Sequence, residues 1–160
     1  MRNTEAALAW IVDILHRENI AFEIDGGLAA QLYGSKRALA DIDINVPEKY
    51  FHKVVPHVKE FLTYGPGNFE DRHWKLLMMT LKYSGQTIDI GALETMRYYD
   101  SLTHNWENFP SDLSSIRIIE YMGMKLPVIN EIKLLIYKQQ LARGVDQKDV
   151  KAMENQLLDQ

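Results

Sequence analysis

Near the N-terminus, apolar residues recur at the spacing of one face of a helix. They stand three or four positions apart, at Leu8, Ile11, Val12 and Leu15. This spacing predicts an amphipathic helix over about residues 5 to 18, and Thr4 is placed to cap its first turn. Acidic residues interrupt the apolar positions and no small-residue cleavage site follows, so a helix is favoured over a signal peptide.

The pattern then changes to alternation of apolar and polar residues, which is typical of strands. Apolar side chains at every second position predict a strand from Ile20 to Asp25, which ends at Gly26-Gly27. The segment LAAQLY that follows predicts a short helix. The loop after this helix carries two cations, Lys36 and Arg37.

Two later segments share one motif, an aspartate between two isoleucines, and both are predicted to be strands. The first runs from Asp41 to Val46, and the residues opposite its apolar face are Asp41, Asp43 and Asn45. The second, Thr87 to Ala92, presents Asp89 in the same way and could lie beside the first. A hairpin turn at Ser84-Gly85-Gln86 connects this second segment to a predicted strand over residues 75 to 83.

Turn and capping signals define the other segments. A helix is predicted from Pro47 to about residue 62, and the turn-rich stretch TYGPGNFEDRHW is predicted to be a loop. Residues 94 to 115 show no clear pattern, and IRIIEYMGMKLPV predicts a hairpin around Gly123. Two helices end the chain, one capped by Asn130 and a last one capped by Asp146.

This order of elements predicts an α+β fold with a small mixed, mostly antiparallel sheet, flanking helices and a C-terminal helical segment. The length of 160 residues fits a single domain overall. Within it we expect a core over residues 1–128 and a C-terminal helical pair over residues 129–160 that packs on the core.

Composition narrows the function classes. The chain has no cysteine, which excludes thiol catalysis and cysteine-ligated zinc and suits a cytoplasmic protein. A net charge of −4 argues against a protein that grips a nucleic acid backbone. No apolar run is long enough to span a membrane. The five histidines are scattered without the spacing of a metal site.

The aspartates are the candidate chemistry. Asp41 and Asp43 lie two positions apart on one strand face, which places their Cα atoms about 6–7 Å from each other. With Asp89 they form a set of like charges that a divalent cation would relieve, and oxygen-only ligands favour Mg²⁺, or Mn²⁺, over zinc. The alternative is that Asp41 and Asp43 only lie on the solvent face of an edge strand.

Two neighbouring features favour a ligand site over this alternative. Gly26-Gly27 lie between a strand and a helix, where backbone N–H groups can receive a phosphate. Lys36 and Arg37 lie in the loop before the aspartates and could complement phosphate oxygens. The combination predicts a phosphate cradle beside a metal pair.

The run from the two glycines to DID, with YGSKRALADIDI within it, resembles the signature of the nucleotidyltransferase superfamily that shares the DNA polymerase beta fold. It is similar to the minimal and the antibiotic- or Abi-type members, whose loops read G-S-x-R-x-T-x-D-I-D. TIDIGAL resembles the strand of the third acidic residue, and the segment from LPVINEIKLL onward resembles the C-terminal helices. Leu39 departs from the pattern, which has threonine there.

The resemblance implies a role for each matching residue. Gly26 and Gly27 would contact a nucleoside triphosphate, Asp41 and Asp43 would ligate the metals, and Asp89 would be a third ligand or the catalytic base. On the penultimate helix, Lys138 would reach a phosphate; the alternative is a solvated lysine on an amphipathic helix. Lys148 and Asp149 would serve helix packing or salt bridging.

The resemblance further implies transfer of an NMP, in the first place AMP, to a hydroxyl of a small molecule such as an antibiotic. Two alternatives stay open. One is a toxin–antitoxin-type nucleotidyltransferase that acts on a protein or tRNA, and the other is a non-catalytic nucleotide-binding domain of the same fold.

Overall fold

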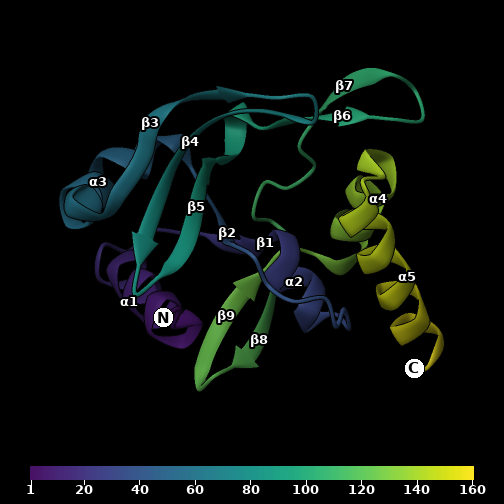
Figure 1. The fold of residues 1–160 in the computed structure, drawn as a ribbon, viewed down its shortest axis with the longest axis horizontal. Coiled ribbons are helices and arrows are strands. Elements are labelled where there is room, and N and C mark those ends of the chain that lie inside the picture. The colour runs from purple at the N-terminus through teal and green to yellow at the C-terminus, as the bar shows by residue number, and fades with distance from the viewer.

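One mixed sheet runs through the computed structural model, which describes residues 1–160. Its strands are β1 Glu23–Asp25, β2 Ile42–Val46, β3 Leu62–Glu70, β4 Trp74–Tyr83, β5 Gln86–Ala92, β6 Arg97–Asp100, β7 Asn105–Asn108, β8 Arg117–Tyr121 and β9 Met124–Val128. They lie in the order β7-β6-β4-β5-β2-β1-β9-β8, with β3 paired to β4 (Figure 1). Only the β2–β5 and β1–β9 pairs are parallel. The predicted mixed, mostly antiparallel α+β fold is confirmed.

Five α-helices accompany the sheet: α1 Thr4–Arg17, α2 Gly26–Leu32, α3 Phe51–Val58, α4 Glu131–Leu141 and α5 Gly144–Leu158. Short 3-10 turns at Glu48–Tyr50 and Lys59–Phe61 extend α3, and another follows β5 at Leu93–Thr95. The N-terminal helix α1 and α3 lie at one end of the molecule, and α4 and α5 pack together at the other (Figure 1). No helix has both the length and the apolar character needed to cross a membrane.

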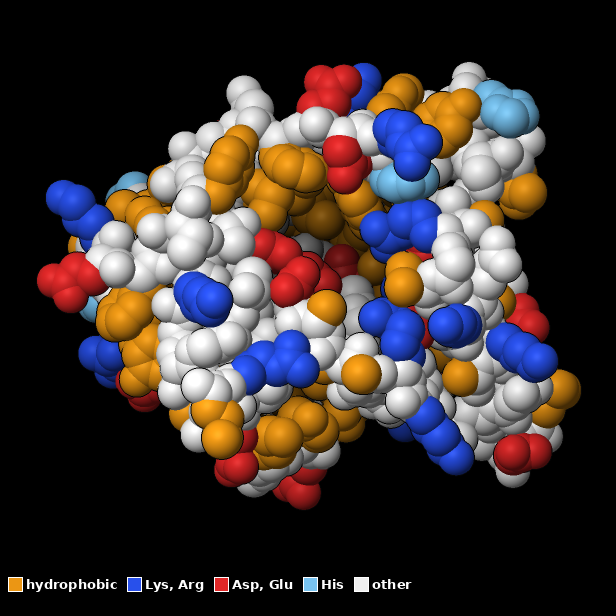
Figure 2. Space-filling view, viewed as in Figure 1, with side chains coloured by type: hydrophobic (Ala, Val, Ile, Leu, Met, Phe, Trp, Pro, Cys, Tyr) orange, Lys and Arg blue, Asp and Glu red, His pale blue; other side chains and the backbone are white.

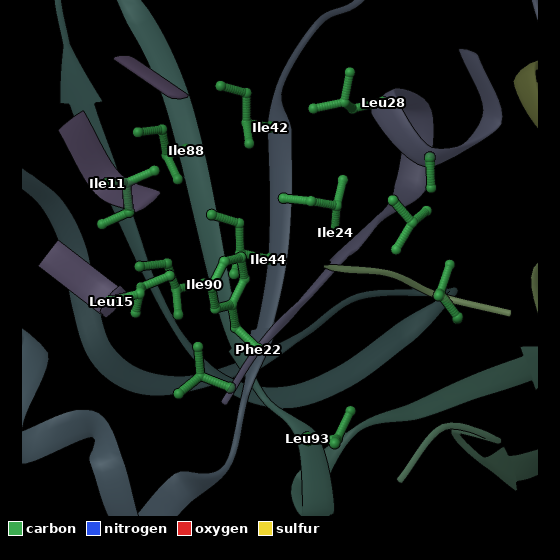
Figure 3. Packing of buried hydrophobic residues seen from close by; sticks show 14 of the residues in the cluster. Ile11, Leu15, Phe22, Ile24, Leu28, Ile42, Ile44, Ile88, Ile90 and Leu93 are labelled. Atoms are coloured by element: carbon green, nitrogen blue, oxygen red, sulfur yellow. The ribbon is translucent and has the colours of Figure 1, made fainter. Parts of the chain in front are cut away.

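The hydrophobic core determines which way the aspartates face. Parallel pairing of β2 with β5 sets Ile42 beside Ile88 and Ile44 beside Ile90, and all four side chains are buried. They pack under α1 together with its apolar face, as Figure 3 shows for Ile11 and Leu15. Because side chains alternate along a strand, the residues between these isoleucines point to the opposite face of the sheet.

Two of the predicted helix caps are wrong and one is confirmed. Asn3, which has an extended backbone, caps α1 by accepting a hydrogen bond from the Ala6 N–H at 2.9 Å, and Thr4 is already helical. Asn130 caps α4 as predicted. Asp146 is the third residue of α5 rather than its cap, and its carboxylate accepts a hydrogen bond from the backbone N–H of Arg143.

The predicted loop TYGPGNFEDRHW is also wrong, because most of it forms β3. This strand pairs antiparallel with β4, with irregular register between Leu62 and Gly67. Its glycines, proline and exposed polar residues give no alternation, because β3 is an edge strand with no buried face of its own. Residues 94 to 115 contain a second unanticipated pair, the antiparallel β6–β7 hairpin. The hairpin predicted around Gly123 is confirmed as β8–β9.

Truncation of a core isoleucine tests this packing. Ile90→Ala should lower the free energy of unfolding by about 2–5 kcal/mol, because the fully buried side chain leaves a cavity. Ile118→Ala removes the same atoms from a residue that is 58% exposed, and should change stability by less than about 0.5 kcal/mol. Denaturant unfolding of both variants measures the difference, and equal losses would contradict the assigned core.

Candidate active site

The sheet register brings the predicted aspartates together. Asp43 on β2 is the direct neighbour of Asp89 on β5, and on its other side it is paired with Asp25 on β1. Three aspartates therefore lie in a row across three adjacent strands. Asp41 immediately precedes β2 and lies on the same side as Asp43. The expected proximity of the two isoleucine-flanked aspartates is confirmed.

These aspartates line a cleft of about 680 Å³. Figure 2 shows the hollow with carboxylates at its centre, hydrophobic side chains along one side and basic side chains along the other. Gly26, Gly27 and Arg37 also line it, whereas Lys36 is exposed and does not. Of the two cations predicted in this loop, the structure places Arg37 at the cleft.

Gly26 is adapted to the carboxylate beside it in two ways. Its φ of +60° lies in the left-handed region, which side chains disfavour. A Cβ at this position would stand 2.1 Å from Oδ2 of Asp43, which is impossible without displacing the carboxylate. The absence of a side chain at residue 26 therefore allows Asp43 to lie directly against the chain where α2 begins.

The electrostatic environment of Asp43 is unfavourable to its charge. Burial raises the pKa of Asp43 well above its usual range, and the neighbouring Asp89, Asp25 and Asp41 raise it further. Burial also raises the pKa of Asp89, against the effect of a hydrogen bond from the Thr80 hydroxyl at 2.7 Å. None of the ion pairs in the structure involves Asp41, Asp43 or Asp89. Carboxylates without cationic partners are suited to an added cation.

A divalent metal fits these residues as an open set. No three carboxylate or imidazole side chains are gathered as a complete metal centre. Mg²⁺ does not need one, because it is usually held by one or two carboxylates together with water and substrate phosphates. Asp41 and Asp43, with Asp89 alongside, offer oxygen donors of the kind that Mg²⁺ prefers, in a cleft open to a ligand.

On the other side of the cleft, two buried aspartates hold three cations. The guanidinium of Arg37 donates to Asp149 at 2.8 and 3.0 Å. Lys138 lies 3.1 Å from Asp149 and 3.2 Å from Asp146, and Arg143 donates to Asp146 at 2.6 Å. Burial alone would raise the pKa of Asp149, but the bonds from Arg37 and Ser35 and the charge of Lys138 outweigh it, so the pKa is lowered. We call these five charged residues the cation network.

The sequence matches the model of the aminoglycoside-2''-adenylyltransferase family over residues 7–154. The chain belongs to this family. It is therefore a nucleotidyltransferase, as the resemblance of its glycine and aspartate motifs indicates. None of the curated proteins matches the chain in sequence.

Solved structures of this fold cover nearly the whole chain. A nucleotidyltransferase candidate from Thermotoga maritima, TM1012, has a TM-score of 0.69 at 24% identity, over 100% of this chain and 97% of its own. The lincosamide antibiotic adenylyltransferase LnuA, bound to lincomycin, has a TM-score of 0.63 at 20% identity, over 96% and 98%. ANT(2'')-Ia with adenylyl-2''-tobramycin has a TM-score of 0.61 at 14% identity, over 97% and 88%. At these identities, the likenesses show a shared fold.

In this family member, part of the basic side of the cleft differs from what the sequence predicts. Arg143 lines the cleft, and although it lies in the segment that resembles the C-terminal helices of the superfamily, no role was predicted for it. Its spacing of three residues from Asp146, at the start of a helix, was the available signal, because such pairs are neighbours on a helix surface. Lys138 is placed differently from a free phosphate ligand, since its side chain is only 3% exposed and already contacts two carboxylates. Asp149 has the salt-bridging position expected for it.

A second buried acidic group was also missed. Glu23 and Asp25 on β1 both accept hydrogen bonds from the amide of Asn45, at 2.8 and 3.0 Å. The hydroxyl of Tyr137 donates to the other oxygen of Asp25. Burial and the charge of Asp25 raise the pKa of Glu23 to about 7. These bonds fix Asp25 at its end of the row of aspartates, and both of its oxygens already accept hydrogen bonds.

Replacing Asp43 should stabilise the metal-free protein. A carboxyl whose pKa is raised by folding binds protons more readily when folded, so it lowers stability as the pH rises above its unfolded value near 3.8. Asp43→Asn removes this penalty, and at pH 7.5 with EDTA it should raise Tm by ~2–4 °C, or about 1 kcal/mol for a chain of this size. Thermal unfolding measures it. A lower Tm in the variant would show that the Asp43 charge is compensated.

Breaking the cation network should be costly. Asp149→Asn leaves Lys138 buried with one carboxylate fewer, and loss of one partner of a buried ion pair costs about 3–5 kcal/mol. The matched control, Asp13→Asn, breaks an Asp–Arg pair that is 64% and 60% exposed and should cost ~1 kcal/mol or less. Denaturant unfolding compares the two variants. Equal small losses would mean that the network does not support the fold.

Proposed function

We propose that this enzyme transfers AMP from ATP to a hydroxyl of a small-molecule acceptor, with the help of Mg²⁺. The observation that carries the proposal is the row of uncompensated aspartates beside Gly26-Gly27 at the open cleft. Family membership supports nucleotidyl transfer to an antibiotic. The choice of ATP, the metal and the individual residue roles are part of this proposal.

The nucleotide would occupy the side of the cleft where the glycines and the cations lie. Backbone N–H groups at Gly26 and Gly27 would receive phosphate oxygens, as at other sites where a strand leads into a helix. Arg37 and Arg143 line the cleft and would meet the outer phosphates. Lys138 would act on this side mainly by holding Asp146 and Asp149, which in turn orient the two arginines.

Asp41 and Asp43 would hold the metal, with Asp89 as a further ligand or as the base. Mg²⁺, when bound, would neutralise phosphate charge and favour attack at the α-phosphorus. The pKa of Asp89 is raised, which makes its carboxylate a stronger base than an ordinary aspartate and suits it to general base catalysis. In that role it takes the proton of the acceptor hydroxyl while the oxygen forms a bond to the α-phosphorus. The bond from this phosphorus to the bridging oxygen breaks, and pyrophosphate leaves.

The acceptor is proposed to be a small hydroxylated molecule such as an antibiotic. LnuA bound to lincomycin and ANT(2'')-Ia in complex with adenylyl-2''-tobramycin show that this fold holds hydroxylated antibiotics and an adenylylated derivative of one. Five aspartates and three cations line the cleft, so it is not a basic surface for a nucleic acid backbone. No observation favours the alternative in which a protein or tRNA is modified.

Activity of aspartate variants tests the proposal. With labelled ATP, Mg²⁺ and an acceptor panel, Asp43→Asn should reduce label transfer and pyrophosphate release to background, because it removes a metal ligand. Asp89→Asn should lower kcat by ~10²–10⁴-fold, the usual contribution of a general base. Asp159→Asn is the control, because Asp159 is exposed and does not line the cleft. This variant should leave activity unchanged. Full activity in Asp43→Asn would exclude the proposed metal site.

A further inference from the structure

The side of the cleft opposite the cations is uncharged. Alternate residues of β4 face it, namely Trp74, Leu76, Met78 and Thr80, and they are joined by Tyr64 and Phe69 of β3 and by Met96. None of these side chains carries a charge, and several apolar ones are left partly exposed rather than packed away. We call these seven residues the apolar wall; Figure 2 shows hydrophobic side chains gathered along this margin of the hollow.

The strand order places the apolar wall on one side of Asp89 and the proposed phosphate site on the other. Across the sheet the sequence of strands is β3, β4, β5, β2 and β1, so Asp89 on β5 lies between the wall and the glycines that follow β1. Thr80, at the inner end of the wall, is paired with Asp89 and donates a hydrogen bond to it. The proposed base therefore touches the wall directly.

The geometry of the proposed reaction indicates which ligand would contact the apolar wall. In phosphoryl and nucleotidyl transfer the attacking and leaving oxygens lie roughly in line on opposite sides of the phosphorus. If pyrophosphate leaves toward Arg37 and Arg143, the attacking hydroxyl has to come from the side of Asp89 and β4. This direction gives the wall to the acceptor rather than to the phosphates.

The charges near the wall limit what the acceptor can be. Asp71 is the one carboxylate of the cleft lining that belongs to the β3–β4 connection, and its Oδ1 already accepts from the backbone N–H groups of His73 and Trp74. Asp25 is satisfied by Asn45 and Tyr137, and the remaining three aspartates are those assigned to metal and base. Only Asp71 is left for a positive group, and a polycation would place further ammonium groups against apolar surface without partners, which is costly.

We infer that the acceptor is an amphipathic hydroxylated molecule, with an apolar group that packs on Leu76, Met78 and Phe69 and at most one positive charge. A polycationic amino sugar does not fit this wall. The inference rests on the proposed function, because the direction of attack defines which side the acceptor occupies.

Binding without turnover tests the inference. The protein is saturated with Mg²⁺ and α,β-methylene-ATP, whose α–β bridge resists cleavage, and titrated with lincomycin, which has one basic amine and an apolar chain, or with tobramycin, which has several amines. Calorimetry should give a Kd for lincomycin about tenfold lower than for tobramycin, a ratio within reach of apolar contacts in a pocket. Equal or tighter binding of tobramycin, or no binding of either molecule, would overturn the inference.

Variants of neighbouring residues identify the wall itself. Leu76→Gln should weaken lincomycin binding about fivefold, comparable to the loss of apolar contact in a pocket, and leave the Kd of the nucleotide analogue unchanged. Leu77→Gln is the matched control, since Leu77 is the next residue of β4 and lies outside the cleft; it should affect neither ligand. If Leu76→Gln weakens the nucleotide analogue instead, the wall holds the nucleobase and the inference is wrong.

Failure of the proposed function and failure of this inference would appear in different measurements. Failure of the function would appear as no pyrophosphate release from ATP with any hydroxylated acceptor, whereas failure of the inference would appear in the binding constants.

Discussion

Parallel pairing between β2 and β5 is the constraint on which the rest of the site depends. The pairing aligns isoleucine with isoleucine and aspartate with aspartate, so one register creates both the buried layer under α1 and the acidic row on the opposite face. A shift of one residue would carry the aspartates into the core. Burial of the aligned isoleucines strongly disfavours such a shift. The same burial therefore holds together carboxylates that repel each other.

The acidic row and the cation network solve opposite electrostatic problems. The network is internally compensated, because two buried aspartates meet three cations and the pKa of Asp149 is lowered. The row has no such partners, and the pKa values of Asp43 and Asp89 are raised. The fold thus compensates charge where a rigid support is needed and leaves it uncompensated where a metal and a nucleotide would bind. Gly26 leaves the room in which the Asp43 carboxylate of the row lies against the chain where α2 begins.

Local patterns in the sequence predicted what depends on neighbouring residues. Alternation around Asp43 and Asp89 predicted the strands, their buried faces and the shared acidic face, and Asn130 was recognisable as a cap. The edge strand β3 could not be recognised, because its pairing comes from β4 rather than from its own side chains. The partners of Lys138 were hidden for a related reason. Whether a helical lysine faces a phosphate or two carboxylates depends on how α4 and α5 pack, and its spacing in the sequence is the same in both cases.

The bond between Arg37 and Asp149 joins residues that are 112 positions apart. Closing so long a segment of chain carries an entropic cost that neighbouring contacts do not share, and non-local contacts of this kind slow folding. On the ribosome, the residues of the acidic row are made well before α5 emerges. The basic half of the cleft therefore cannot be completed until α5 has been made, because Asp146 and Asp149 of this helix hold its three cations in place.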